Sequence, residues 1–285
     1  METRREFLVQ LTSALPVIAV RPHEARRAGV GQATTVRVQR LSWAGVKVEG
    51  PSTTLLVDPW GTPSIWGGAW TRPVVPIEVN TPAQFALITH AHSDHYDPTL
   101  LRRLLEERGS VVCHEALAPY IASHGLRILS QRLHEPRQVG DFVVTPVPAV
   151  DGAGEEQVSW VIAGGGRKLF HGGDTLWHGH WWLLAEQYGP FDAAFLPING
   201  AVVKARAPFA EVPASLTPTQ AVAAAQVLGA HTLVPIHYGL HSPNAYEEQP
   251  DVVATVRRVC RERGVTVQVV DEGGWVQWPA ASAER

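Results

Sequence analysis

The segment from residue 88 to residue 97 constrains this chain more than any other part of it. Its sequence is Ile-Thr-His-Ala-His-Ser-Asp-His-Tyr-Asp, and it follows a short apolar stretch that predicts a buried strand. If the segment stays extended, His90 and His92 point the same way, because side chains alternate along a strand. Asp94 and His95 then follow in a turn, where they can face a second position. Imidazole and carboxylate suit zinc and neighbouring divalent metals, so the segment predicts two adjacent metal sites rather than a histidine-rich surface turn.

The order histidine-x-histidine-x-aspartate-histidine is the signature of the metallo-β-lactamase superfamily, which the chain resembles over residues 35–275. Further along, Lys-Leu-Phe-His-Gly-Gly-Asp-Thr is similar to the family's glycine-aspartate-threonine motif, and the resemblance implies that Asp174 bridges two metals. The stretch Leu-Val-Pro-Ile-His-Tyr-Gly looks like the strand that delivers the last histidine. The resemblance therefore implies that His237 completes the second site together with Asp94 and His95.

One position departs from the family pattern. The third ligand of the first site is usually a histidine after a strand that ends in proline-alanine, but here the strand at 142–150 is followed by Asp151. A carboxylate is itself a competent ligand, and two histidines with one carboxylate form an open set for zinc and for iron. The first site would then be His90, His92 and Asp151. The alternative is that Asp151 is only a turn residue before Gly152, which leaves the first site weakened or empty.

Two divalent ions that share a bridging hydroxide generate a nucleophile at neutral pH and stabilise the anionic transition state of carbonyl or phosphoryl attack. We therefore expect a metal-dependent hydrolase that uses a metal-bound hydroxide on a phosphodiester, an ester or a lactone. The expected cofactors are two divalent ions, zinc first, with iron or manganese as alternatives. Asp94 is the candidate catalytic residue. The expected metal ligands are His90, His92, Asp94, His95, Asp151, Asp174 and His237. The alternative is a metal-binding, non-catalytic member with an altered first site.

Shorter stretches point to one branch of the superfamily. Leu-Pro-Ile-Asn-Gly at 196–200, Leu-Thr-Pro-Thr-Gln-Ala at 216–221 and the early Asp58-Pro59 are similar to a particular group. That group includes the N-acyl-phosphatidylethanolamine phospholipase D enzymes and the L-ascorbate-6-phosphate lactonases. A true β-lactamase shares the first loop, but the downstream segments match this group better. The substrate does not follow from the resemblance, and we expect a small molecule or a lipid-like compound.

Aromatic and histidine side chains near the predicted centre are candidate substrate contacts. Trp66 and Trp70 lie in a glycine- and proline-rich loop before the metal-binding strand. Exposed aromatic rings at a cleft hold acyl chains or sugars, whereas burial against the sheet is the alternative. His178 and His180 follow closely on the expected bridging aspartate, and His241 lies four residues past the last expected ligand. For these histidines the alternative is a surface patch.

Residue patterning predicts one α/β domain over residues 35–275. Strands are predicted at 35–41, 53–58, 86–89, 110–113, 140–150, 158–163, 168–171, 193–197, 232–237 and 265–270, and helices at 98–108, 116–124, 181–188, 218–228 and 251–263. Asp97 before Pro98 and Thr217 before Pro218 are typical helix starts. The family resemblance implies a four-layer αββα sandwich, with two mixed β-sheets and helices outside.

Composition and the first residues bear on location and partners. A net charge of -3 gives no general attraction for nucleic acid or anionic membrane, so no nucleic-acid partner is expected. Residues 1–30 contain Thr-Arg-Arg-Glu-Phe-Leu, which looks like a twin-arginine export signal and predicts a periplasmic or secreted protein. The alternative is a cytoplasmic chain with a chance Arg-Arg start. No stretch predicts a transmembrane segment. Cys113 and Cys260 are expected in the core rather than in catalysis.

Overall fold

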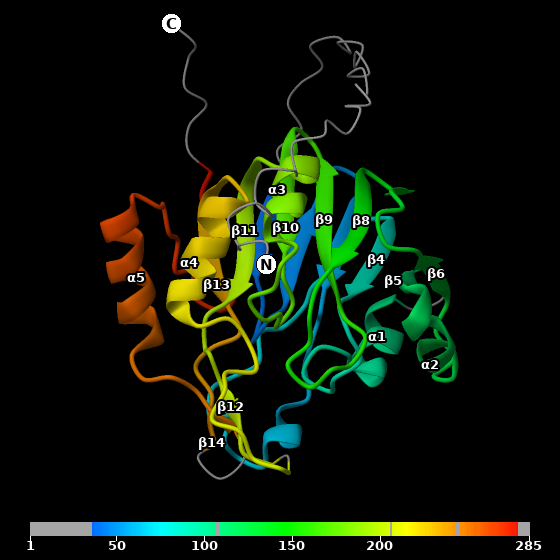
Figure 1. Cartoon of the computed structure of the whole chain (residues 1–285). Helices are drawn as coiled ribbons and strands as arrows, with labels where there is room; N and C mark the ends of the chain where they lie inside the picture. Colours follow the sequence, from blue (N-terminus) through cyan, green and yellow to red (C-terminus); the bar gives the residue numbers. More distant parts are fainter. Residues whose placement is uncertain (1–35, 106–108, 206, 243–245, 279–285) are drawn as a thin grey trace, which may run out of the picture. The chain divides into compact units, whose positions relative to one another are not determined.

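The structure, a computed structural model, describes residues 36–105, 109–205, 207–242 and 246–278. These residues belong to one unit, Thr34–Arg285. The segment predicted to be an export signal, residues 1–30, lies outside the described residues. Two six-stranded sheets and a smaller three-stranded sheet carry the fold (Figure 1).

The first large sheet has the strand order β1-β2-β3-β4-β5-β6. Its first three strands are antiparallel, and β3 to β6 run parallel. All residues of β3 are buried, as expected for a parallel strand that is covered on both faces. The strands are β1 (Arg37–Arg40), β2 (Val46–Glu49), β3 (Thr53–Val57), β4 (Ala83–Ile88), β5 (Ser110–His114) and β6 (Ile128–Gln131).

The second large sheet has the order β13-β11-β10-β9-β8-β7. Strands β10, β11 and β13 are parallel, while β8 and β10 both pair antiparallel with β9. Strands β8, β10, β11 and β13 therefore end at the same edge of the sheet. The strands are β7 (Arg137–Val139), β8 (Phe142–Pro148), β9 (Val158–Gly164), β10 (Arg167–His171), β11 (Phe191–Pro197) and β13 (Ala230–Ile236).

Three hydrophobic clusters hold the layers together. The largest lies between the sheets and contains Leu55 of the first sheet and Leu169 of the second. Phe170, the next residue along β10, points to the other face and packs beneath α3, α4 and α5, because side chains alternate along a strand. A third cluster joins Ile88 to Leu101 of α1 on the outer face of the first sheet. The result is a mixed αββα sandwich, as the family resemblance implied (Figure 1).

The helices begin where the sequence provides caps. The Asp97 Oδ1 atom accepts a hydrogen bond from the Leu100 amide at 2.9 Å. Thr217 and Gln220 form a complete capping box at the start of α4. Both helix starts were predicted from these residues and are confirmed. The helices are η1 (Pro63–Trp66), α1 (Pro98–Leu105), η2 (Glu115–Leu117), α2 (Ala118–Ala122), α3 (Trp181–Tyr188), α4 (Pro218–Val227) and α5 (Val252–Arg263).

A small sheet lies at the lower end of the molecule in Figure 1, in the order β12-β15-β14. Its strands are β12 (Val202–Val203), β14 (His241–Ser242) and β15 (Tyr246–Glu247). The Trp66 and Tyr246 rings lie 5.5 Å apart, so η1 packs against β15. This lower part therefore joins two loops that are far apart in the sequence.

Several predicted elements differ from the structure. Residues 265–270 form no strand but only an isolated bridge between Leu233 and Val267. The helix predicted at 116–124 is shorter, because a 3-10 turn precedes α2. Strands β2, β6 and β7 were not predicted, since they are short and contain charged or polar residues. Cys113 and Cys260 are buried, as expected. Within the part of the chain that is described, no helix is both long and apolar enough to cross a membrane.

Candidate metal centre

The histidine-rich loop begins where β4 ends and is fixed there by Asp58. The Thr89 amide donates to Asp58 Oδ1 at 2.8 Å, and the Thr89 hydroxyl donates to Oδ2 at 2.6 Å. The backbone then turns sharply, because the amides of His95 and Tyr96 both donate to the His92 carbonyl, at 3.0 and 2.8 Å. This turn brings the side chains of the loop to the edge where β8, β10 and β13 end.

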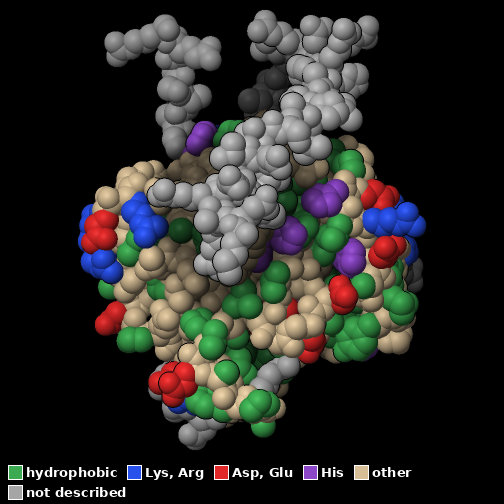
Figure 2. Space-filling view, viewed as in Figure 1, with side chains coloured by type: hydrophobic (Ala, Val, Ile, Leu, Met, Phe, Trp, Pro, Cys, Tyr) green, Lys and Arg blue, Asp and Glu red, His purple; other side chains and the backbone are tan. Residues whose placement is uncertain are grey.

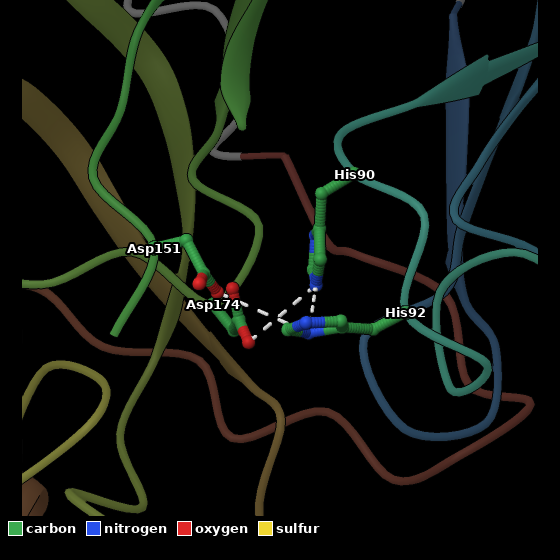
Figure 3. A group of neighbouring side chains, drawn as sticks. All are labelled: His90, His92, Asp151 and Asp174. Atoms are coloured by element: carbon green, nitrogen blue, oxygen red, sulfur yellow. Dashed lines mark hydrogen bonds and ion pairs between the residues drawn. The ribbon is translucent and has the colours of Figure 1, made fainter. Parts of the chain in front are cut away.

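The first group of possible ligands consists of His90, His92, Asp151 and Asp174, whose donor atoms all lie within 4.8 Å of one another. Figure 3 shows these four side chains pointing toward a common centre, with His90 and His92 on one loop and the two aspartates on other segments. His90 Nε2 lies 2.9 Å from His92 Nδ1 and 3.7 Å from Asp174 Oδ2. His92 Nδ1 lies 3.9 Å from Asp151 Oδ2. Ligand atoms that each lie about 2 Å from one ion are separated from one another by distances like these. The group therefore has the spacing of a metal site.

The second group consists of Asp94, His95 and His237. Asp94 Oδ2 lies 3.7 Å from His95 Nε2 and 3.6 Å from His237 Nε2. Asp174 Oδ2 is 4.0 Å from His237 Nε2, so this carboxylate reaches both groups. That position is the one expected for a bridging aspartate. The structure thus brings together all seven residues that the sequence proposed as ligands.

Each histidine is held through the ring nitrogen that faces away from the centre. Nδ1 of His90 contacts the Thr89 hydroxyl at 3.0 Å, and Nδ1 of His95 contacts Asp58 at 2.8 Å. Nε2 of His92 lies 3.1 Å from the Glu155 carboxylate. Nδ1 of His237 lies 3.1 Å from the Asn199 carboxamide. Partners of this kind orient the imidazoles that bind metals in proteins.

Buried atoms without partners test whether a metal fits here. His95 Nε2, His237 Nε2 and Asp174 Oδ1 are buried and make no hydrogen bond within the described residues. Buried polar atoms nearly always have a partner, so an unsatisfied cluster of two imidazole nitrogens and a carboxylate oxygen needs an explanation. Divalent metal ions provide one, since these are the atoms that such ions bind.

The electrostatics of the centre favour a bound cation. Burial opposes ionisation of Asp94, but His95 and His237 outweigh it and hold the pKa of this carboxyl well below its usual range. Burial likewise opposes ionisation of Asp58, yet the hydrogen bond and charge of His95 lower its pKa. Burial also disfavours a charged His95, but Asp94 and Asp58 raise its pKa to about 9. The carboxylates are therefore ionised at neutral pH.

Asp151 combines the two roles that the sequence left as alternatives. Its Oδ1 atom accepts hydrogen bonds from the amides of Ala153 at 2.7 Å and Glu155 at 3.0 Å, which is a turn role. Its Oδ2 atom faces His92. The turn contacts therefore fix a carboxylate whose second oxygen remains directed at the first group of ligands.

Three residues around the centre were not predicted from the sequence. Trp43 donates from its indole nitrogen to Asp94 Oδ2 at 2.9 Å. Glu155 and Asn199 hold two of the histidines, as described above. None of these residues belongs to a ligand motif. The motif Asp58-Pro59 was noticed in the sequence, but nothing there indicated that Asp58 would anchor His95.

A cavity of about 260 Å³ opens beside the ligands. Its lining consists of Trp66, His92, Ser93, Asp94, Asp151, Gly152, Ala153, Asp174, Val203, Ala214, Ser215, His237 and Tyr246. Of the predicted substrate contacts, only Trp66 is in this lining. Trp70 is buried against Trp60, with ring centroids 4.7 Å apart, and His178 stacks on Trp181 at 4.4 Å. His180 lies beside His178, and the side chain of His241 is outside the described part.

Comparisons with known proteins agree with this fold and with a metal-dependent hydrolase. Residues 53–238 match the family model described as "Beta-lactamase superfamily domain". A UPF0173 metal-dependent hydrolase from Thermococcus onnurineus is 28% identical over 222 residues, which cover 75% of this chain and 89% of the relative. The metallo hydrolase Igni18 from Ignicoccus hospitalis is similar in structure, with a TM-score of 0.64 at 20% identity over 85% of this chain and 98% of that one. An isothiocyanate hydrolase from Delia radicum gut bacteria has a TM-score of 0.66 at 16% identity, over 86% and 99% of the two chains.

Proposed function

The chain belongs to the β-lactamase superfamily and is a metal-dependent hydrolase, and we propose that it cleaves an ester, a lactone or a phosphodiester at a centre of two divalent ions. The observation that carries this proposal is the convergence of two ligand groups that share Asp174. The first group would hold one ion through His90, His92, Asp151 and Asp174. The second would hold the other through Asp94, His95, His237 and Asp174.

When bound, two such ions lower the pKa of a water molecule and stabilise the negative charge that develops on the attacked group. The side chains of the protein orient the water and the substrate. Asp94 and Asp174 line the cavity, where their oxygens can orient the attacking water and hold its proton. Trp66 and Val203 form an apolar part of the wall, against which a substrate can exclude bulk water.

The ligand types bear on which metal is used. Zinc is compatible with every ligand atom in both groups. Asp151 supplies an oxygen where an imidazole would supply nitrogen, and oxygen-rich sets also suit iron and manganese. We propose zinc, with iron or manganese as the alternatives. Export through a twin-arginine signal and membership of the phospholipase D and lactonase branch remain predictions from the sequence.

The experiment for this proposal combines metal removal with a hydrolase screen. Chelation should abolish turnover of model esters, lactones or phosphodiesters, and re-addition of zinc, iron or manganese should restore it. Chelation should also lower the melting temperature, since an ion present at 100 times its Kd stabilises the native state by about 2.7 kcal/mol. Bound metal without turnover of any such substrate would instead support the alternative of a non-catalytic, metal-binding member.

A further inference from the structure

The described lining of the cavity beside the ligands contains acidic side chains but neither lysine nor arginine. Asp94, Asp151 and Asp174 line it, whereas neither lysine nor arginine is found in the lining formed by the described residues. Enzymes that bind phosphate groups usually use arginine or lysine for them, because a cation offsets the phosphate charge. The wall therefore lacks the groups that would recognise an anionic substrate.

Three basic side chains on the neighbouring described segments form ion pairs. Arg40 and Arg72 both contact Glu272, at 3.7 and 3.0 Å. Lys204 follows Val203 on the lower lobe and forms an ion pair with Glu247. In Figure 2 the basic side chains of this face lie mostly at its two sides, while the lower lobe that carries β12 and β14 shows hydrophobic side chains together with acidic ones.

Asp151 changes the charge of the centre itself. Two divalent ions would carry four positive charges, and the three ligand carboxylates offset three of them. Two further carboxylates lie beside the ligands, Asp58 at 2.8 Å from His95 and Glu155 at 3.1 Å from His92. A neutral imidazole in place of Asp151 would make the centre more positive by one charge and more attractive to anions. Asp151 therefore leaves the loaded centre without excess positive charge, which weakens the field that concentrates anionic substrates.

The wall of the cavity at Trp66 is aromatic and closely packed. The Trp66 ring packs edge-on against Trp43, with ring centroids 5.7 Å apart, and in a tilted arrangement against Tyr246 at 5.5 Å. The Tyr246 hydroxyl is bonded to Asn199, and burial, followed by the nearby Asp94 and Asp174, raises the pKa of this phenol well above its usual value. This side of the cavity thus presents neutral surface to a ligand.

We propose that the cavity takes an uncharged carboxylic ester or lactone, with its acyl group against Trp66, in preference to a phosphodiester; this proposal rests on the hydrolase function proposed above. In the reaction the oxygen of water forms a bond to the carbonyl carbon and the bond to the alcohol oxygen breaks. One proton of the water goes to the departing alcohol oxygen, and the other is released as the acid ionises. A centre without excess positive charge then does not retain the anionic product.

A matched pair of substrates tests the proposal on the metal-loaded protein. 4-Nitrophenyl hexanoate and mono-4-nitrophenyl adipate share a leaving group and a chain length and differ in one terminal carboxylate. We expect kcat/KM to be at least about tenfold higher for the hexanoate, as the electrostatic effect on encounter implies. Asp151→His should shrink this ratio. Glu156→Gln, which removes a charge from an exposed residue of the same loop, should leave it unchanged.

Binding of inorganic phosphate provides a readout that does not depend on turnover. Millimolar phosphate should leave the melting temperature of the metal-loaded wild type unchanged and should raise that of Asp151→His. An equal or higher kcat/KM for the adipate, or stabilisation of the wild type by phosphate, would overturn the proposed charge preference while leaving the hydrolase function intact. If neither ester is turned over, the hydrolase proposal loses support, and the phosphate result alone decides whether the centre excludes anions.

Discussion

The indole nitrogen of Trp43 donates a hydrogen bond to Asp94 Oδ2 over 2.9 Å, and this contact ties the second group of ligands to the core between the sheets. The same tryptophan accepts a hydrogen bond from the His237 amide at 3.1 Å, and its ring lies 4.2 Å from the His237 ring. Trp43 is fully buried and has a φ of 59°, a conformation that bulky residues rarely adopt. Asp58 and His237 also have positive φ values, so three such residues surround the centre. Backbone strain of this kind gathers at functional sites, where the surrounding structure maintains it.

Replacing Trp43 with Phe should weaken metal binding without unfolding the protein. An aromatic ring remains in the core, but Asp94 loses its donor, and loss of such a partner costs roughly 10- to 100-fold in metal affinity. Competition with a chromophoric chelator measures the change. The matched control is Trp160→Phe, since Trp160 is also buried and its indole nitrogen has no hydrogen-bond partner in the described residues. Equal metal affinity in the two variants would show that the contact does not position Asp94.

Replacing Asp151 with His should raise the affinity of the first group for zinc, because an imidazole nitrogen replaces a carboxylate oxygen. The same change removes the hydrogen bonds from the Ala153 and Glu155 amides, so the metal-free variant should lose on the order of 1 kcal/mol of stability. Metal analysis and the melting curve of the metal-free protein separate the two effects. Unchanged zinc affinity would count against Asp151 as a ligand. Asp151 would then act only through its hydrogen bonds in the turn.

The structure assigns different outcomes to the two tryptophans of the loop before β4. Trp66 lines the cavity, so Trp66→Ala should raise KM several-fold with a small change in melting temperature. Trp70 is only 7% exposed, and the Arg72 guanidinium lies 3.5 Å from its ring centroid. Trp70→Ala should therefore cost about 3–5 kcal/mol of stability. Kinetics and denaturation of both variants check this, and a selective KM effect at Trp70 would contradict the assignment.

His178 should make the protein sensitive to acid. Burial, with a smaller contribution from His180, lowers the pKa of His178 to about 4, against 6.5 for an ordinary histidine. The unfolded chain therefore takes up a proton at this position before the folded one does, and stability falls as the pH drops from about 6.5 to about 4. His178→Phe keeps the stacking on Trp181 and should flatten this part of the stability profile. An identical profile in the variant would show that His178 does not carry the effect. As a control, the stability of the wild type and of the variant should depend on pH in the same way above pH 7.

The sequence predicted most where the relevant residues are neighbours. Four ligands lie in one short loop, and the caps at Asp97 and Thr217 depend on residues three positions away. The assignments of Asp174 and His237 needed the family resemblance. These residues follow the ends of β10 and β13, and only the order of the strands in the sheet brings them close to the first loop. Contacts between residues that are distant in the sequence could not be predicted from it. Trp43 precedes Asp94 by 51 positions, and no local pattern links them.

The same limit explains the errors in secondary structure and in the substrate contacts. Residues 265–270 alternate like a strand, yet they make only an isolated bridge with Leu233. The loop with Trp66 and Trp70 was predicted as a unit, but packing exposes one ring to the cavity and buries the other. Which of two nearby aromatic rings faces a cavity depends on the tertiary fold and not on composition.

Metal content per chain, measured by plasma mass spectrometry on protein purified without added metal, tests the central claim most directly. Two ligand groups that share Asp174 predict about two ions per chain, in line with two-metal hydrolytic sites. The same measurement on Asp174→Asn should give a lower value, because this carboxylate reaches both groups. One ion or none in the wild type would contradict the two-metal account and bring forward the non-catalytic alternative.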